Sequence, residues 1–135
     1  MNSTVYLLLR LAVGASALGH GLVRISKMKA FSQWMGDAFS KSMLPRSAVV
    51  SFALLLPVIE LILGILLISG LFTHQALVVG SFEMIFLIFG CCMIENWEPI
   101  ASQLIHLIIY VVLIQFLSSN YIALDNLFDQ KNGNP

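Results

Sequence analysis

The sequence predicts an all-α, polytopic membrane protein: a four-helix bundle with an amphipathic interfacial helix between the first and second membrane helices. The chain is 59% hydrophobic and 10% charged, and its mean hydropathy of +0.91 lies far outside the range of soluble domains. Four apolar stretches each have roughly the 20 residues needed to cross a hydrocarbon layer ~30 Å thick. None alternates polar with apolar residues, so helices are predicted rather than the strands of a barrel.

The first apolar stretch covers residues 5–25. Its segment 15–17, Ala-Ser-Ala, is similar to a signal-peptide cleavage site, but no Lys or Arg precedes the apolar run and Arg10 interrupts it. We therefore expect this helix to be retained. One face of the helix carries both the charge and the small residues: Arg10, Gly14, Ala17 and Gly21. A neighbouring helix is expected to approach closely on that face.

Residues 27–42 are predicted to form the interfacial helix. Polar residues occupy most of its circumference, and large apolar residues recur at helical spacing: Met28, Phe31, Met35 and Phe39. Trp34 and the neighbouring basic residues would anchor this helix at the lipid headgroups. Pro45 would end it before the second membrane helix begins.

The other apolar stretches cover residues 47–70, 75–94 and 99–117, and a short tail covers residues 118–135. Only tight turns separate the second, third and fourth stretches. No soluble domain fits in what is left, so residues 1–135 are predicted to form a single four-helix transmembrane domain.

The orientation follows from the basic residues near the membrane. Five of them lie in or beside the first connection: Arg24, Lys27, Lys29, Lys41 and Arg46. The N-terminus and the second turn have none, so the positive-inside rule places the first connection in the cytoplasm. The third turn, residues 95–98, is then cytoplasmic too, and both termini are periplasmic.

Three ionisable residues lie deep within three different helices. Arg10, Glu60 and Glu83 come out at roughly 16 to 23 Å from the cytoplasmic face if each residue rises 1.5 Å. An isolated charge at that depth costs at least ~3 kcal/mol, so we expect Arg10 to pair with both acids. Two carboxylates against one cation predict that one Glu is protonated. Both a structural ion pair and a working site are consistent with this pattern.

Two histidines extend the polar interior toward the cytoplasmic side. His106 shares a helix face with Gln103 and Tyr110, and His20 lies near the cytoplasmic end of the first helix. Such donors at the edge of an apolar pocket suit a neutral quinone headgroup. Polar side chains that bond one another across helices are the alternative. Haem is not expected, because two lone histidines make no haem motif.

Other chemistry finds no support in the sequence. Cys91 and Cys92 are adjacent, form no CxxC motif, and are interpreted as small apolar side chains. No metal-ligand spacing, nucleotide-binding loop or nucleophile elbow occurs. We therefore predict no catalytic residue and no metal site.

Short motifs in the chain resemble the DoxX family of membrane proteins. They are residues 9–14 (LRLAVG), 19–22 (GHGL) and 57–73 (PVIELILGILLISGLFT), and the resemblance covers roughly residues 5–117. It implies a small multi-pass protein of the bacterial inner membrane, whose relatives include subunits of thiosulfate:quinone oxidoreductase and terminal quinol oxidase complexes. Arg10, His20 and Glu60 lie within these motifs, so the resemblance implies a functional role for these three residues. The cysteine pairs of the related disulfide-handling branch are missing here.

The leading functional hypothesis is an accessory subunit of a quinone-linked redox complex rather than an enzyme by itself, because no redox centre is encoded. A buried polar or quinone pocket is expected among seven residues: Arg10, His20, Glu60, Glu83, Gln103, His106 and Tyr110. The alternatives are a structural or assembly subunit and a proton or small-solute pathway. Membrane lipids and other membrane subunits are the expected partners, and no nucleic acid is expected.

Overall fold

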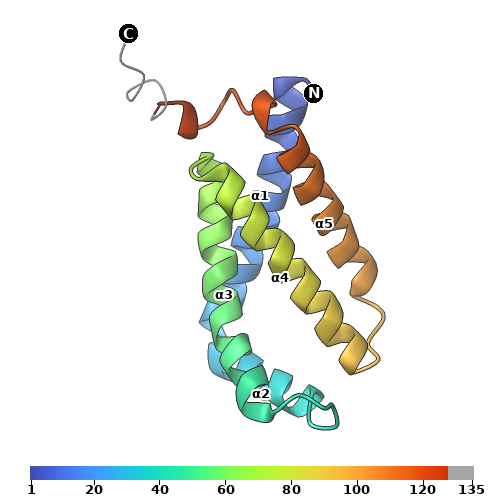
Figure 1. Cartoon of the computed structure of the whole chain (residues 1–135). Coiled ribbons are helices and arrows are strands. Elements are labelled where there is room, and N and C mark those ends of the chain that lie inside the picture. The colour runs from blue at the N-terminus through green and yellow to red at the C-terminus, as the bar shows by residue number, and fades with distance from the viewer. Residues whose placement is uncertain (128–135) are drawn as a thin grey trace.

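Residues 1–127 are described by a computed structural model, in which every regular element is helical (Figure 1). The elements follow in the order α1 (Ser3–Ser26), α2 (Met28–Ala38), α3 (Arg46–Ser69), α4 (Thr73–Met93), α5 (Ile100–Gln115) and a short 3-10 helix, η1 (Leu117–Ser119). No strand occurs in this part of the chain, so the prediction of an all-α fold is confirmed. Residues 128–135 of the predicted tail lie outside it.

Three of the helices have the length and composition of membrane spans. The 24 residues of α1, the 24 of α3 and the 21 of α4 are long and apolar enough to cross a membrane. α5 is apolar but has only 16 residues, which corresponds to a rise of about 24 Å. It is shorter than the predicted range 99–117, because Pro99 precedes its first residue and the chain tightens into η1 after Phe116.

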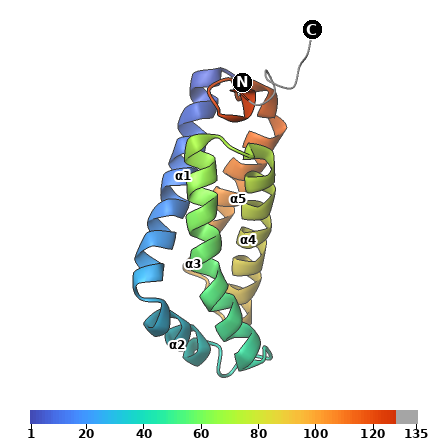
Figure 2. The ribbon, with the colours of Figure 1, turned by 90° about the vertical axis from the view of Figure 1, so that its left-hand side faces the viewer.

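The long helices run side by side, with α2 lying across one end of the molecule (Figures 1 and 2). Met35 and Phe39 of the α2 segment pack with Val49 and Ala53 of α3 in a small buried cluster. At the other end lie the N-terminus, the turn between α3 and α4, and the end of α5 (Figure 1). In that view α4 leaves α3 at their shared turn and slants away from it toward α2.

Glycines allow α1 and α3 to pack closely. A Cβ atom added to Gly21 would lie 2.7 Å from the Leu61 Cα atom of α3, which is too close for real atoms. A Cβ atom on Gly64 would likewise lie 2.5 Å from the Leu18 Cα atom of α1. The small-residue face predicted for the first helix therefore does meet a neighbouring backbone, the arrangement that lets membrane helices associate without a hydrophobic driving force.

Replacing Gly21 with Leu is expected to force α1 and α3 apart and to lower the free energy of unfolding by about 2 kcal/mol, as overpacking does elsewhere. The matched control is Gly19→Leu, because a Cβ atom at Gly19 meets nothing within 4 Å. Unfolding by an anionic detergent, followed by circular dichroism, measures both variants. Equal stability of the two would contradict this packing.

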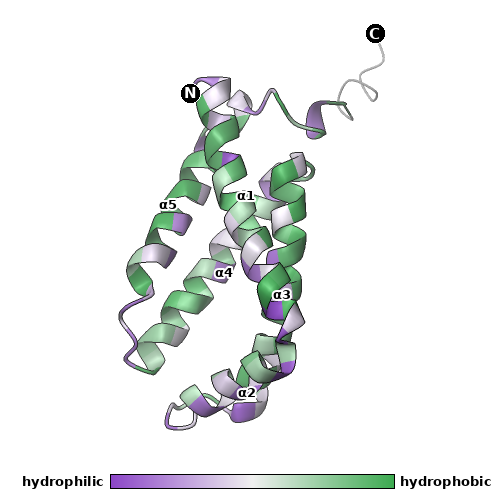
Figure 3. Ribbon diagram, turned by 180° about the vertical axis from the view of Figure 1, so that it is seen from behind, coloured by the Kyte–Doolittle hydropathy of each residue, from purple (hydrophilic) through white to green (hydrophobic). Residues whose placement is uncertain are grey.

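Apolar residues make up most of the long helices (Figure 3). Large aliphatic and aromatic side chains stay exposed there, among them Leu8, Ile62, Phe82, Phe86 and Ile108. Large apolar side chains exposed on four helices are suited to lipid rather than to water. Together with the three candidate spans, they identify a multi-pass membrane protein.

The segment after η1 folds back over the turn between α3 and α4. Asp125 accepts hydrogen bonds from the backbone N–H groups of Phe72 (2.6 Å) and Thr73 (2.9 Å), and its own N–H donates to the Gly70 carbonyl (2.9 Å). Its carboxylate therefore caps the N-terminus of α4, which has no side-chain cap of its own.

Candidate functional site

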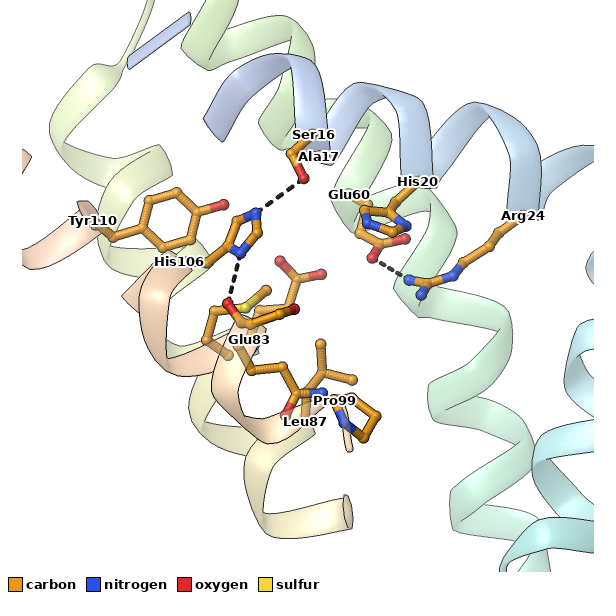
Figure 4. A pocket seen from close by; sticks show the side chains of 13 residues that line it. Ser16, Ala17, His20, Arg24, Glu60, Glu83, Leu87, Pro99, His106 and Tyr110 are labelled. Atoms are coloured by element: carbon orange, nitrogen blue, oxygen red, sulfur yellow. Dashed lines mark hydrogen bonds and ion pairs between the residues drawn. The ribbon is translucent and has the colours of Figure 1, made fainter. Parts of the chain in front are cut away.

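A polar cavity of about 170 Å³ lies among α1, α3, α4 and α5 (Figure 4). We call it the polar cavity. Its lining residues are Ser16, Ala17, His20, Arg24, Glu60, Glu83, Met84, Leu87, Pro99, Ser102, Gln103, His106 and Tyr110. Six of the seven residues proposed from the sequence line this cavity, and the exception is Arg10.

Glu60 forms an ion pair with Arg24, a residue that was expected near the membrane surface. The Arg24 guanidinium of α1 donates to Glu60 Oε1 of α3 and forms an ion pair with it (Figure 4). Glu60 is only 4% exposed, and its second carboxylate oxygen has no hydrogen-bond partner within residues 1–127. Ion pairing offsets the cost of placing both charges within an apolar bundle.

The position of Arg24 in the sequence is consistent with a side chain that faces the bundle. Arg24 lies fourteen positions after Arg10 and continues the stripe of Gly14, Ala17 and Gly21 at the i+14 position of the same helix face. Because Arg24 also lies near the end of the apolar stretch, the positive-inside rule includes it among the basic residues that orient the chain. Its side chain instead reaches back into the bundle and lies over the Phe31 ring, 5.1 Å from the ring centroid.

Glu83 of α4 carries the second buried carboxyl group. It is 6% exposed, and its side chain points into the polar cavity (Figure 4). Its Oε1 atom has no hydrogen-bond partner in the part of the chain that the structure describes. Within residues 1–127, no Lys or Arg side chain lies within ion-pair distance of it. Tyr110 of α5 is packed against α4 at Gly80, where an added Cβ atom would lie 2.9 Å from its ring.

His106 connects α5 to α1. Its Nδ1 atom lies 2.8 Å from the Ser102 carbonyl oxygen, and its Nε2 atom lies 3.0 Å from Ser16 Oγ. A carbonyl oxygen only accepts, so Nδ1 carries a hydrogen, and in the neutral ring Nε2 accepts from the Ser16 hydroxyl. Both ring nitrogens are therefore engaged, which fixes the orientation of the imidazole at the cavity wall (Figure 4).

Gln103 and His20 complete the polar lining. The Gln103 amide nitrogen lies 3.5 Å from Cys91 Sγ, while its buried Oε1 atom has no hydrogen-bond partner among the described residues. His20 lies one turn before Arg24 on α1 and faces the cavity beside Glu60 (Figure 4). No group of three or more His, Cys, Asp or Glu residues within residues 1–127 is placed to hold a metal ion.

The predicted pairing of Arg10 with Glu60 and Glu83 is wrong. Arg10 is 2% exposed, and it donates to Asn120 Oδ1 (2.5 Å) and to the Ile122 carbonyl (2.8 Å). Fourteen residues separate Arg10 from Arg24, which is about 21 Å of helix. The Arg10 side chain therefore lies outside the polar cavity, toward the opposite end of the bundle from Arg24, where the segment after η1 supplies its acceptors.

Comparison with protein-family models finds a match over residues 5–92 to the family described as DoxX. The match spans more than half of the chain and contains all three motifs on which the resemblance was based, so that prediction is confirmed. No curated protein matches the chain, and no solved structure matches it.

Proposed function

The chain belongs to the DoxX family of integral membrane proteins, and from this premise we propose that it is an accessory subunit of a quinone-linked redox complex. The polar cavity would hold the headgroup of the quinone. The observation that carries the proposal is the convergence of Glu60, Glu83 and His106, from three different helices, on one cavity in an otherwise apolar bundle. Buried polar groups in a membrane are costly unless they meet a ligand, water or one another.

The proposed topology is a single domain with four membrane helices, in which α5 is the fourth span and α2 lies at the interface. Support comes from α2, where Trp34 is exposed and stacks on Phe31 at a centroid distance of 6.1 Å. Exposed Lys27 and Lys29 flank these rings. Aromatic and basic residues together favour the headgroup layer.

The basic first connection is expected to face the cytoplasm of a bacterial inner membrane, with both termini in the periplasm. A reporter active only in the periplasm and fused to the C-terminus should therefore be active. A cytoplasmic reporter at the same position should be silent, and both activities should reverse when the reporters are inserted between residues 95 and 98. The opposite pattern would invert every assigned side.

Replacing Glu60 with Gln, or His106 with Ala, is expected to impair quinone-dependent turnover of the parent complex by at least about tenfold while the complex still assembles. Gln keeps the shape of Glu but not its charge or its titrating proton, and general acid–base groups typically contribute 10²–10⁴-fold. Turnover and subunit stoichiometry are measured on the same purified complex.

The control for these substitutions is Glu95→Gln, which changes an exposed acid in the turn between α4 and α5. It should leave turnover unchanged. If Glu60→Gln and His106→Ala also keep full quinone-dependent activity in an intact complex, the headgroup site is ruled out.

A structural or assembly subunit is the second candidate. The Arg24–Glu60 ion pair favours it, since this pair joins α1 to α3, the two helices that pack through glycine. Under that alternative the buried charges only fix helix register. Activity in the variants would then fall in proportion to the amount of assembled complex.

A further inference from the structure

The polar cavity is not closed off from the rest of the molecule. A second, apolar cavity of about 480 Å³ adjoins it, and four residues line both: Arg24, Leu87, Pro99 and Gln103. We call this second space the apolar cavity. It lies between α2 and α3 on one side and the end of α4 on the other, where α4 slants away from α3 (Figure 1).

The walls of the apolar cavity are aromatic and aliphatic. Phe31, Trp34 and Phe39 line it from the α2 segment, and Phe86 and Phe89 line it from α4. Trp34, Phe86 and Phe89 are each more than half exposed, so the cavity opens where the headgroup layer beside Trp34 meets the hydrocarbon beside Phe86 and Phe89. Its contents would therefore be exchanged with the membrane rather than with water.

Size indicates that the polar cavity is only part of a binding site. Small-molecule sites typically enclose roughly 300–1,000 Å³. The polar cavity alone falls below that range, the apolar cavity falls inside it, and the two adjoining cavities together also fall inside it. An occupant of both must be polar at one end and apolar along the rest of its length.

The polar end of that occupant can be specified from the unpaired atoms. Three buried oxygens at the polar cavity have no hydrogen-bond partner among the described residues: Glu60 Oε2, Glu83 Oε1 and Gln103 Oε1. The Gln103 amide oxygen accepts, and each carboxyl group keeps at least one accepting oxygen even when it is protonated. Leaving a buried acceptor unpaired costs roughly 1–3 kcal/mol. A headgroup that donates hydrogen bonds, such as the hydroxyls of a hydroquinone, would satisfy these oxygens.

We propose that the two cavities form one site for a tailed hydroquinone, with its hydroxyls at Glu83 and Gln103 and its hydrocarbon tail in the apolar cavity. This inference rests on the proposed function and adds the reduced state of the headgroup and the location of the tail. The ligand enters sideways from the bilayer, past Trp34 and Phe89.

The test measures anaerobic binding to the full chain in phospholipid nanodiscs by calorimetry. The probes are tetramethylhydroquinone, its oxidised quinone, and a decyl-substituted hydroquinone. Ala48→Trp and Gly90→Leu fill the apolar cavity from α3 and from α4. The matched control is Ala101→Trp, which makes the first of these changes at an exposed position that lines neither cavity. Glu83→Leu removes an acceptor from the polar cavity.

The parent chain should bind both hydroquinones, and at least about tenfold more tightly than the oxidised quinone. Filling the apolar cavity should weaken the decyl probe at least about tenfold while the tail-less probe binds as before. Glu83→Leu should weaken both, and Ala101→Trp should weaken neither.

The outcomes separate the two proposals. If the cavity-filling variants leave the decyl probe unaffected, or weaken both hydroquinones alike, the tail site is overturned and the headgroup site stands. Equal affinity for the oxidised and reduced probes overturns the donor assignment. If the parent binds no probe, or Glu83→Leu binds as the parent does, the headgroup site falls and the further inference falls with it.

Discussion

Arg24→Leu is expected to lower the free energy of unfolding by about 3 kcal/mol, because it leaves Glu60 buried without a cation and close to Glu83. Breaking a buried ion pair by removing one partner typically costs 3–5 kcal/mol. The lower end applies here, since the Arg24 side chain is 28% exposed and the Glu60 side chain 5%. Unfolding in an anionic detergent, followed by circular dichroism, gives the value.

Two further variants show whether the stranded charge is the cause. The double variant Arg24→Leu with Glu60→Leu should recover most of the lost stability, because the unpaired carboxylate is removed with its partner. Arg46→Leu breaks the exposed Arg46–Asp37 pair (2.9 Å) and should cost at most about 1 kcal/mol. If Arg24→Leu were as stable as the parent, the ion pair would not contribute to the stability of this bundle.

Arg10→Leu is expected to be as damaging, with a loss of about 3–5 kcal/mol. Two hydrogen bonds from a buried guanidinium disappear, and the Asn120 side chain and the Ile122 carbonyl lose their donor. Hydrogen bonds to charged groups contribute roughly 1.5–3 kcal/mol each. The same detergent unfolding measures the loss.

A local effect on the segment that Arg10 binds distinguishes Arg10→Leu from a variant that only loses stability in general. Without Arg10, the segment from Asn120 to Asp125 should come away from α1 and be cut by chymotrypsin at Tyr121 much faster than in the parent. Arg10→Lys keeps the charge but cannot make both bonds, so it should lie between Leu and the parent. Slow cleavage at Tyr121 in Arg10→Leu would contradict the role assigned to this side chain.

The helices were predictable because hydropathy and length act over windows of about twenty residues. α1, α3 and α4 begin and end within two residues of the predicted ranges. α5 is shorter than its apolar stretch, since apolar composition does not show where a chain tightens into a 3-10 turn, as it does at Leu117.

Much of the polar cavity was also accessible from sequence. Glu60, Glu83 and His106 are polar residues inside apolar runs, and such residues face the interior of a bundle. Which cation meets which acid was not accessible, because Arg10 and Arg24 share one helix face. The depth estimate, which started every helix at one common level, favoured Arg10, whereas Glu60 pairs with Arg24. The acceptors of Arg10 lie in a segment without periodicity, at Asn120 and Ile122, so no pattern indicated them.

No pattern in the sequence indicated the apolar cavity. Phe31 and Phe39 recur at helical spacing in a pattern that also describes an ordinary interfacial helix. Phe86 and Phe89 lie in an apolar run in which every position is equally compatible with lipid contact. The cavity results from the angle between α3 and α4 (Figure 1), and that angle is set by tertiary packing rather than by composition.

Native mass spectrometry of the protein purified in mild detergent tests most directly whether the polar cavity holds a quinone-type headgroup. The parent and the control Glu95→Gln should each carry a quinone or hydroquinone, while Glu83→Leu should carry none although it retains its ordinary phospholipids. A parent chain that carries phospholipid alone, or a Glu83→Leu chain that keeps its quinone, would contradict the claim.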